Sequence, residues 1–252
     1  MGDGVVGKLS GERFLVPYLI AYPRWFVAVG SASSRTAFMF VMVQQAAGAG
    51  WREAAELYDL NSPPQILADL DFENMKASGY ASPIPANDAS LTTEPSALSA
   101  GYALYLNDHA QGPQQPNFLA GGYTTDYVKT DQQTATGAAA KGWKFTDTHA
   151  AVNEPTYALR LPNGGALVIF YTSATISWTA MSSSAVTSTG ATGLPYSPPS
   201  QVLSQLGISA ARRGLRVSVT AIDENLAVLG PAGAQGATIV VSDAKGITFA
   251  KS

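Results

Sequence analysis

Apolar and aromatic residues gather along the chain in runs of strand length, separated by short segments rich in glycine, proline and serine. The run over residues 14–29 is aromatic and β-branched, and a Gly/Ser segment at 30–34 separates it from the apolar run 36–43. Two such runs joined by a short turn predict a β-hairpin of buried strands. The second run is apolar throughout, which predicts a strand covered on both faces or part of a very hydrophobic concave sheet. Residues 51–60 contain helix formers but follow the hairpin, and we predict a third strand there.

Two helices are predicted in the middle of the chain. Pro95 is placed as the first-turn proline of a helix over residues 96–108. The apolar positions of this segment form one stripe suited to lying against a sheet: Leu98, Tyr102, Tyr105 and Leu106. A second, weaker helix is predicted over 123–140, where threonines and a glycine lower the helix propensity.

A second group of strands follows the helices. In chain order they are predicted over 143–146, 157–161, 166–179, 216–222, 226–229 and 238–241. Residues 162–165, Pro-Asn-Gly-Gly, supply the left-handed positions of a tight hairpin. Asp223-Glu224-Asn225 is interpreted as a turn, residues 182–200 as an exposed loop, and 201–207 as a short helical turn.

The chain also repeats itself. The aromatic segment 22–29 recurs in kind over 156–171, which predicts two related halves. We predict an α+β fold in which each half is a curved antiparallel sheet, the second with a packed helix. The N-terminal β-rich half would occupy residues 1–82, lacks an obvious leading helix and is expected to be truncated; the C-terminal half would occupy residues 83–252.

Composition excludes several classes of function. The 15 basic residues are scattered in a chain of net charge −3, which argues against a nucleic-acid partner. The absence of cysteine removes disulfides, zinc–thiolate sites, iron–sulfur clusters and thiol catalysis, and it fits export through an oxidising space. The most apolar stretch is interrupted by Pro17, Pro23 and Arg24, so no transmembrane segment is predicted.

Four segments resemble a group of actinobacterial secreted proteins and lipoproteins of unknown function. They are Tyr-Pro-Arg-Trp-Phe at 22–26, a segment that starts at Trp51, a proline-bounded helix over 83–106, and Arg-x-x-x-Gly-Gly-Ala-Leu-Val at 160–168. The resemblance implies two NTF2- or cystatin-like rolls in tandem and an extracytoplasmic protein, either secreted or membrane-anchored, and it implies no activity. The sequence departs from a lipoprotein by lacking the lipobox cysteine, so a lipid anchor would lie in an N-terminal segment outside this sequence.

Acid–base chemistry has one candidate pair. His109 is expected at the end of the first helix, where it would interact with the helix dipole, and His149 is expected in a solvated loop. If Asp147 and His149 instead pointed into a roll, they could act as a general base and its orienting partner, because residues two apart on a strand share a face. Nothing else in the sequence supports this pairing, and we predict no catalytic residue.

Metal and phosphate sites are not predicted. Asp69, Asp71 and Glu73 alternate and would share one face of a strand, an arrangement that can hold Ca²⁺. The glycine and later glutamate of a calcium loop are absent, so a solvated acidic face is the favoured interpretation. Gly164-Gly165 lacks a phosphate-binding motif, no G-x-S-x-G occurs, and no cofactor is expected.

Ligand binding depends on aromatic side chains and two arginines. Arg24 and Arg160 lie amid apolar neighbours in equivalent strands, where structural ion pairing is favoured over anion recognition. Several aromatic residues fill a core or line a cone-shaped pocket for an apolar ligand: Tyr18, Tyr22, Trp25, Phe38, Phe40, Tyr157, Phe170, Tyr171 and Trp178. The candidate ligand-binding residues are Arg24, Trp25, Arg160, Tyr171 and Trp178.

Together these patterns favour an extracytoplasmic, non-enzymatic binding or scaffold protein that acts on another cell-envelope protein. The alternative is a binder of an apolar small molecule in an aromatic-lined cone. An NTF2-like dehydratase or isomerase is the third hypothesis, and it would require Asp147 and His149 to lie in a cavity.

Overall fold

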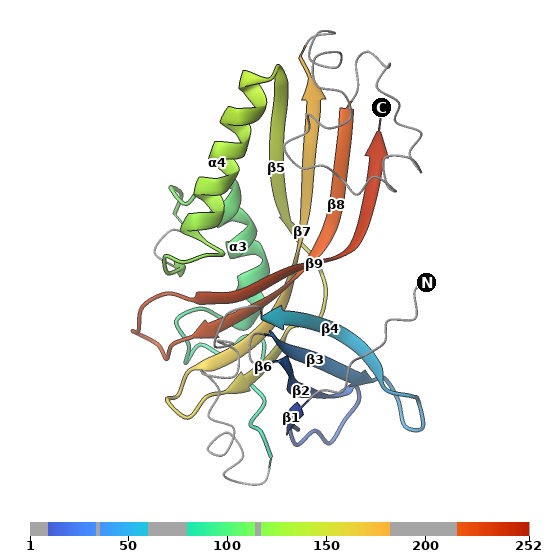
Figure 1. Ribbon diagram of the computed structural model, residues 1–252. Helices are drawn as coiled ribbons and strands as arrows, with labels where there is room; N and C mark the ends of the chain where they lie inside the picture. Colours follow the sequence, from blue (N-terminus) through green and yellow to red (C-terminus); the bar gives the residue numbers. More distant parts are fainter. Residues whose placement is uncertain (1–9, 34–35, 60–79, 114–116, 182–215, 252) are drawn as a thin grey trace.

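The structure, a computed structural model, describes residues 10–33, 36–59, 80–113, 117–181 and 216–251 (Figure 1). The predicted acidic face of Asp69, Asp71 and Glu73 lies outside these residues. So do the predicted loop at 182–200 and the predicted helical turn at 201–207.

The first sheet is an antiparallel meander in the order β1-β2-β3-β4. Its strands are β1 (Ser10–Leu15), β2 (Arg24–Ser33), β3 (Thr36–Gln44) and β4 (Arg52–Asp59). The hairpin and the third strand are therefore confirmed. The single buried strand predicted over 14–29 is wrong, because β1 ends at Leu15 and a loop over residues 16–23 precedes β2. Two prolines bound this loop, and proline cannot donate to a ladder of backbone hydrogen bonds.

Strand β3 is not covered equally on its two faces. Burial alternates along it, so that Met39 and Val41 are completely buried while Phe38 and Phe40 are only partly covered. The partly covered face carries its own aromatic contacts, with the rings of Phe38 and Tyr58 4.9 Å apart. Alternation of this kind is typical of a sheet with one face in the core and one toward solvent.

The second sheet is antiparallel in the order β5-β7-β8-β9, and the short β6 also pairs with β7. Its strands are β5 (Trp143–Ala151), β6 (Tyr157–Arg160), β7 (Ala166–Ala180), β8 (Arg216–Leu229) and β9 (Thr238–Lys251). Strand β8 is continuous, so the turn predicted at 223–225 is wrong. Asp223, Glu224 and Asn225 each pair with both β7 and β9, and this two-sided pairing outweighs the low strand propensity of Asp and Asn.

The β6–β7 hairpin is confirmed, and its two glycines have different reasons to be glycine. Gly164 has φ of +83°, a left-handed conformation that side chains disfavour. At Gly165 a Cβ would come within 2.2 Å of the backbone oxygen of Leu229 on β8. Gly164 is therefore required by the backbone conformation of the turn, and Gly165 by the close approach of β8.

Both helices are confirmed: a 3₁₀ turn η1 (Pro95–Ala97) leads into α3 (Leu98–Asn107), and α4 (Thr125–Ala140) follows. The predicted apolar stripe of α3 is buried. Figure 1 shows both helices on one face of the second sheet, with the first sheet below and on the other side. No helix among the described residues is long and apolar enough to cross a membrane.

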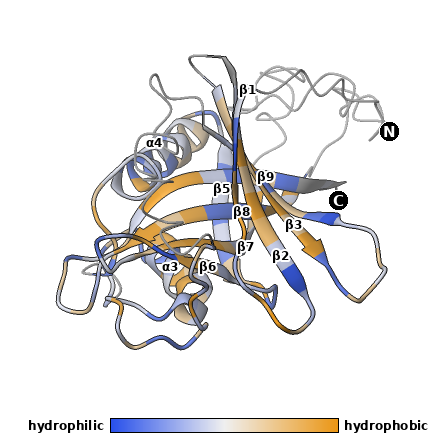
Figure 2. Cartoon of the chain, turned by 90° about the horizontal axis from the view of Figure 1, so that it is seen from below, coloured by the Kyte–Doolittle hydropathy of each residue, from blue (hydrophilic) through white to orange (hydrophobic). Residues whose placement is uncertain are grey.

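The core lies in two main layers, with hydrophobic residues concentrated along the strands of both sheets (Figure 2). Between the sheets, Val27, Met39 and Leu57 pack in one cluster with Ile169 and Leu226. Between the helices and the second sheet, a second cluster contains the following buried side chains: Leu98, Tyr102, Tyr105, Phe170 and Leu229. The described protein is thus an α+β structure of two antiparallel sheets with helices on one outer face.

Side chains of the second sheet cover the outer edge of β4. The Glu56 backbone N–H donates to Glu224 Oε2 at 2.7 Å, and Lys245 Nζ lies 2.9 Å from Glu56 Oε2. The Tyr171 hydroxyl donates to the Ala54 carbonyl oxygen at 3.0 Å. The bonds from Glu224 and Tyr171 satisfy backbone groups that an edge strand would otherwise leave open to pairing with another chain.

The predicted boundary between halves, at residue 82, lies in a segment that touches both sheets. Ala81 forms a bridge with Pro17, and Pro83 forms one with Leu159 on β6. Both sheets also contribute to one buried cluster. The division into residues 1–82 and 83–252 stays a prediction.

Candidate functional site

A cluster of exposed apolar side chains surrounds the loop over residues 16–23. Seven of the ten large exposed apolar residues in the described part of the chain lie here. We call them the aromatic patch: Phe14, Val16, Tyr18, Ile20, Tyr22, Trp51 and Tyr80. Ile20 is 82% exposed and Tyr18 is 66% exposed. Exposed apolar side chains that gather in one place, rather than singly, are typical of an interaction site.

Backbone contacts hold the loop of the patch in place. The Ala81 N–H donates to the Val16 carbonyl oxygen at 3.0 Å, and Pro17 beside it is buried. The rings of Tyr18 and Tyr80 then meet edge to face with centroids 5.4 Å apart. The start of the loop, next to Tyr18, is therefore held in place.

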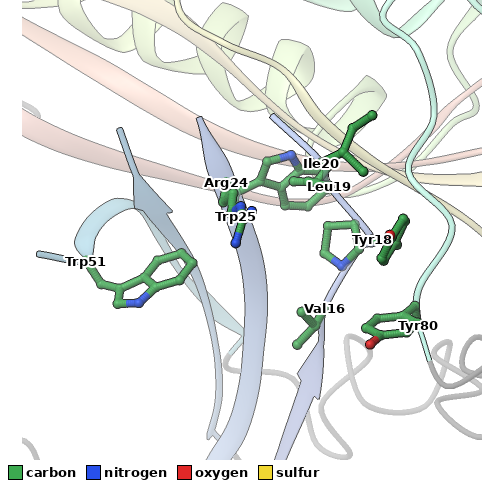
Figure 3. Close-up of a pocket in the computed structure, with 9 residues that line it drawn as sticks. Val16, Tyr18, Leu19, Ile20, Arg24, Trp25, Trp51 and Tyr80 are labelled. Atoms are coloured by element: carbon green, nitrogen blue, oxygen red, sulfur yellow. The ribbon is translucent and has the colours of Figure 1, made fainter. Parts of the chain in front are cut away.

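A surface pocket of about 420 Å³ lies within the patch (Figure 3). Its lining consists of Val16, Pro17, Tyr18, Leu19, Ile20, Arg24, Trp25, Trp51 and Tyr80. Arg24 is the single charged residue in this lining, and its guanidinium lies 4.8 Å from the ring centroid of Tyr22. The pocket thus combines apolar and aromatic walls with one cation.

Two of the five candidate ligand-binding residues, Arg24 and Trp25, come together in this pocket. Trp25 also packs against Tyr157, with ring centroids 5.3 Å apart, and this contact joins the pocket to the core between the sheets. Sequence reasoning treated Tyr18 and Tyr22 as interior aromatics and did not select Trp51 or Tyr80. The signal that marks the patch is the absence of charge from residue 16 to residue 23 between two interrupting prolines.

The structure does not bring Arg160, Tyr171 and Trp178 to the pocket. Arg160 pairs with Asp88 and donates to the Gly164 carbonyl oxygen at 3.1 Å, so it fastens the β6–β7 hairpin. Hydrogen bonds from Ser90, with a further contribution from Arg160, lower the pKa of the Asp88 carboxyl. Tyr171 is buried between the sheets, and Trp178 is buried beside Trp143 in a third cluster.

A second feature is a buried polar band between α4 and the second sheet. His149 lies in β5, so the predicted solvated loop position is wrong. It is 6% exposed, and its Nε2 is 3.3 Å from Asp147 Oδ2. The Tyr127 hydroxyl of α4 donates to the same carboxylate oxygen at 2.6 Å. Asn107 of α3 holds the backbone of His149 by donating to its carbonyl oxygen at 2.7 Å and accepting its N–H at 2.8 Å.

Carboxyl groups around this pair hold protons more tightly than usual. Burial, then the charge of Asp147, raises the pKa of Asp131 on α4 to about 6. Burial also raises the pKa of Asp223 on β8 to about 6, although the nearby His149 acts in the opposite direction. Burial and the Asp147 carboxylate raise the pKa of Tyr127, which keeps its hydroxyl a donor.

The polar band can share protons, but its side chains line neither the pocket of the aromatic patch nor a second surface pocket on α4, which is lined by Lys129, Gln132, Gln133, Thr136 and Gly137. Asp147 Oδ1 and His149 Nδ1 are buried without a hydrogen-bond partner. Among the described residues, no group of three or more histidine, aspartate or glutamate side chains is arranged to hold a metal ion. The aromatic patch is therefore the more accessible of the two features.

The fold defines an α+β protein of two antiparallel sheets, and comparison with known proteins defines its family. Residues 4–198 match the family described as a domain of unknown function, DUF8094, and the chain belongs to this family. It is 27% identical over 168 residues to an uncharacterized lipoprotein of Streptomyces avermitilis, an alignment that covers 66% of this chain and 47% of the relative. It is 26% identical over 166 residues to an uncharacterized lipoprotein of Streptomyces coelicolor, covering 65% of this chain and 47% of the relative.

The chain thus spans about half the length of these curated relatives. No solved structure gives a significant match. The resemblance to actinobacterial lipoproteins of unknown function is confirmed by these relatives.

Proposed function

We propose that the protein is an extracytoplasmic binding protein that contacts its partner through the aromatic patch. The location is supported by the two relatives named as lipoproteins. The binding role is supported by one observation, the gathering of seven large exposed apolar side chains around a single loop. Two of the predicted ligand-binding residues, Arg24 and Trp25, line the pocket inside this patch.

Exposure of these side chains has an energetic consequence. Burying a large apolar side chain contributes about 1.5–3 kcal/mol, and Tyr18, Ile20 and Trp51 leave most or nearly half of their surface in water. A partner that covers them recovers this free energy without a large ordering cost, since the loop is already held by its contact to Ala81. An exposed apolar loop that is held at one end is a suitable centre for a binding surface.

Photo-crosslinking in actinobacterial cells tests this proposal. A benzophenone amino acid is placed at Tyr18 in the patch and, as the matched control, at Leu104 of α3, which is 49% exposed. We expect covalent adducts from position 18, whether to protein or to lipid, and far fewer from position 104. An Ile20→Ser change beside the probe should reduce the adducts, since it removes apolar contact area. Equal labelling from positions 18 and 104 would contradict a binding role for the patch.

Finer hypotheses stay predictions. These are a cell-envelope protein as partner, an apolar small molecule as ligand, and the relation of each sheet to an NTF2- or cystatin-like roll. The Asp147 and His149 side chains lie 3.3 Å apart, but the dehydratase or isomerase hypothesis also requires them to lie in a cavity. We place binding first because the aromatic patch lines a pocket, whereas Asp147 and His149 line neither that pocket nor the pocket on α4.

A further inference from the structure

We propose that the partner of the aromatic patch is the surface of an anionic phospholipid bilayer. This inference rests on the proposed binding function of the patch and names the chemistry of what it binds. Three observations carry it: the composition of the loop over residues 16–23, the kinds of side chain around the loop, and the charges at its base.

The loop itself is suited to insertion into the outer layer of a bilayer. Its eight residues, Val-Pro-Tyr-Leu-Ile-Ala-Tyr-Pro, contain no charge. Ile20 is 82% exposed, which is the largest exposure among the large apolar residues described. An exposed aliphatic residue on a fixed uncharged loop can enter the boundary between head groups and acyl chains without burying a charge. The loop backbone is held at Val16 and Pro17, so insertion orders little additional chain.

The side chains around the loop are those that favour the membrane interface. Trp51 is 45% exposed, Tyr80 is 49% exposed and Tyr22 is 37% exposed, and each has an apolar ring with a polar group. Tryptophan and tyrosine are enriched where a membrane meets water because such rings can satisfy both environments. Figure 3 shows Trp51 on one side of Val16, and Tyr80 beside Tyr18 on the other side.

Charge at the base of the patch selects for anionic head groups. Arg24 lines the pocket, and its guanidinium lies 4.8 Å from the ring centroid of Tyr22. Arg52 follows Trp51 in the chain and is exposed, but it does not line the pocket. No acidic side chain among the described residues forms an ion pair with either arginine, and none lines the pocket. The one charged side chain in the lining of the pocket is therefore a cation, in a chain of net charge −3. Arginines beside an inserted apolar loop are complementary to anionic lipids, and each contributes about a fivefold gain in affinity.

Vesicle binding tests the inference. The purified chain is sedimented with vesicles of phosphatidylcholine alone and with vesicles that also contain phosphatidylglycerol, and tryptophan emission is recorded. We expect binding to the phosphatidylglycerol vesicles, a blue shift as Trp51 leaves water, and weaker binding at high salt. Ile20→Ser should weaken binding about tenfold or more. Arg24→Gln with Arg52→Gln should remove the preference for phosphatidylglycerol.

Leu104→Ser is the matched control, because Leu104 is a half-exposed apolar residue on α3. It should leave vesicle binding unchanged. The inference is overturned if the chain does not bind phosphatidylglycerol vesicles, or if Ile20→Ser and Leu104→Ser behave alike. Protein adducts from Tyr18 in cells together with no vesicle binding would overturn the inference and leave the proposed function standing. If Tyr18 gave no adducts in cells and the chain did not bind vesicles, both the inference and the proposed function would be overturned.

Discussion

Glu224 lies at the junction of the two sheets, and its replacement by glutamine tests the electrostatics of that junction. The residue is 9% exposed, and its Oε2 accepts the Glu56 backbone N–H at 2.7 Å. Burial raises the pKa of this carboxyl from 4.5 to about 7, against the lowering effects of the Glu56 N–H and of Lys245. The folded protein therefore binds a proton at Glu224 at pH values where the unfolded chain has lost it.

The sign of the effect follows from this difference in proton binding. Between pH 4.5 and about 7 the folded state binds more protons at Glu224 than the unfolded state, so this residue makes stability fall as pH rises. Above about pH 7 Glu224 is ionised in both states, and the free energy of unfolding is then lowered by the full cost of ionising this buried carboxyl. At ~1.4 kcal/mol for each pH unit, the interval between the two pKa values sets an upper limit of roughly 3 kcal/mol. Glutamine cannot ionise but keeps an oxygen to accept the Glu56 N–H.

Urea unfolding measured by tryptophan fluorescence from pH 4.5 to pH 8 is the assay. We expect Glu224→Gln to match the natural protein near pH 4.5 and to exceed its free energy of unfolding by about 1–3 kcal/mol at pH 8. Glu12→Gln on the exposed strand β1 is the control and should give no such difference. A difference that does not change with pH, or a glutamine variant that is less stable at pH 8, would refute the reasoning.

Three further changes test other parts of the fold. Tyr127→Phe removes the hydroxyl that donates to Asp147 at 2.6 Å, so we expect the free energy of unfolding to fall by about 1–3 kcal/mol and amide hydrogen exchange in α4 to become faster. Unchanged exchange would contradict the contact. Gly164→Ala should lower the free energy of urea unfolding by about 1 kcal/mol, and Gly165→Ala should lower it far more, because only the alanine at 165 places a Cβ against the backbone of β8. Equal losses would contradict this packing. Leu57→Ala should cost about 2–5 kcal/mol and leave one unfolding transition in calorimetry, since the sheets share a core; two separate transitions would contradict that core.

Local pattern was sufficient for most elements. The apolar spacing of Leu98, Tyr102, Tyr105 and Leu106 predicts α3 because a helix brings residues three and four apart onto one face. The Pro-Asn-Gly-Gly segment predicts the β6–β7 hairpin because its turn needs a residue with positive φ. Both rules involve only neighbours in the chain, so one sequence is enough to apply them.

The candidate site was only partly predictable. Arg24 and Trp25 were selected from the sequence and do line the pocket, but Trp51 and Tyr80 join them from other parts of the chain. The prediction that the segment around Tyr18 is buried was wrong, because an apolar segment is buried only where another layer of the protein covers it.

The sequence by itself determined both helices, most of the strands, the α+β class and the absence of cysteine chemistry. Only the tertiary structure decided that Asp223, Glu224 and Asn225 lie inside β8, that His149 is buried against Asp147, and that Arg160 is held by a residue far along the chain. Each of these depends on a partner strand or side chain remote in sequence. The environment of a polar residue, and with it the pKa and the role of that residue, is set by such remote partners, and a local pattern contains no record of them.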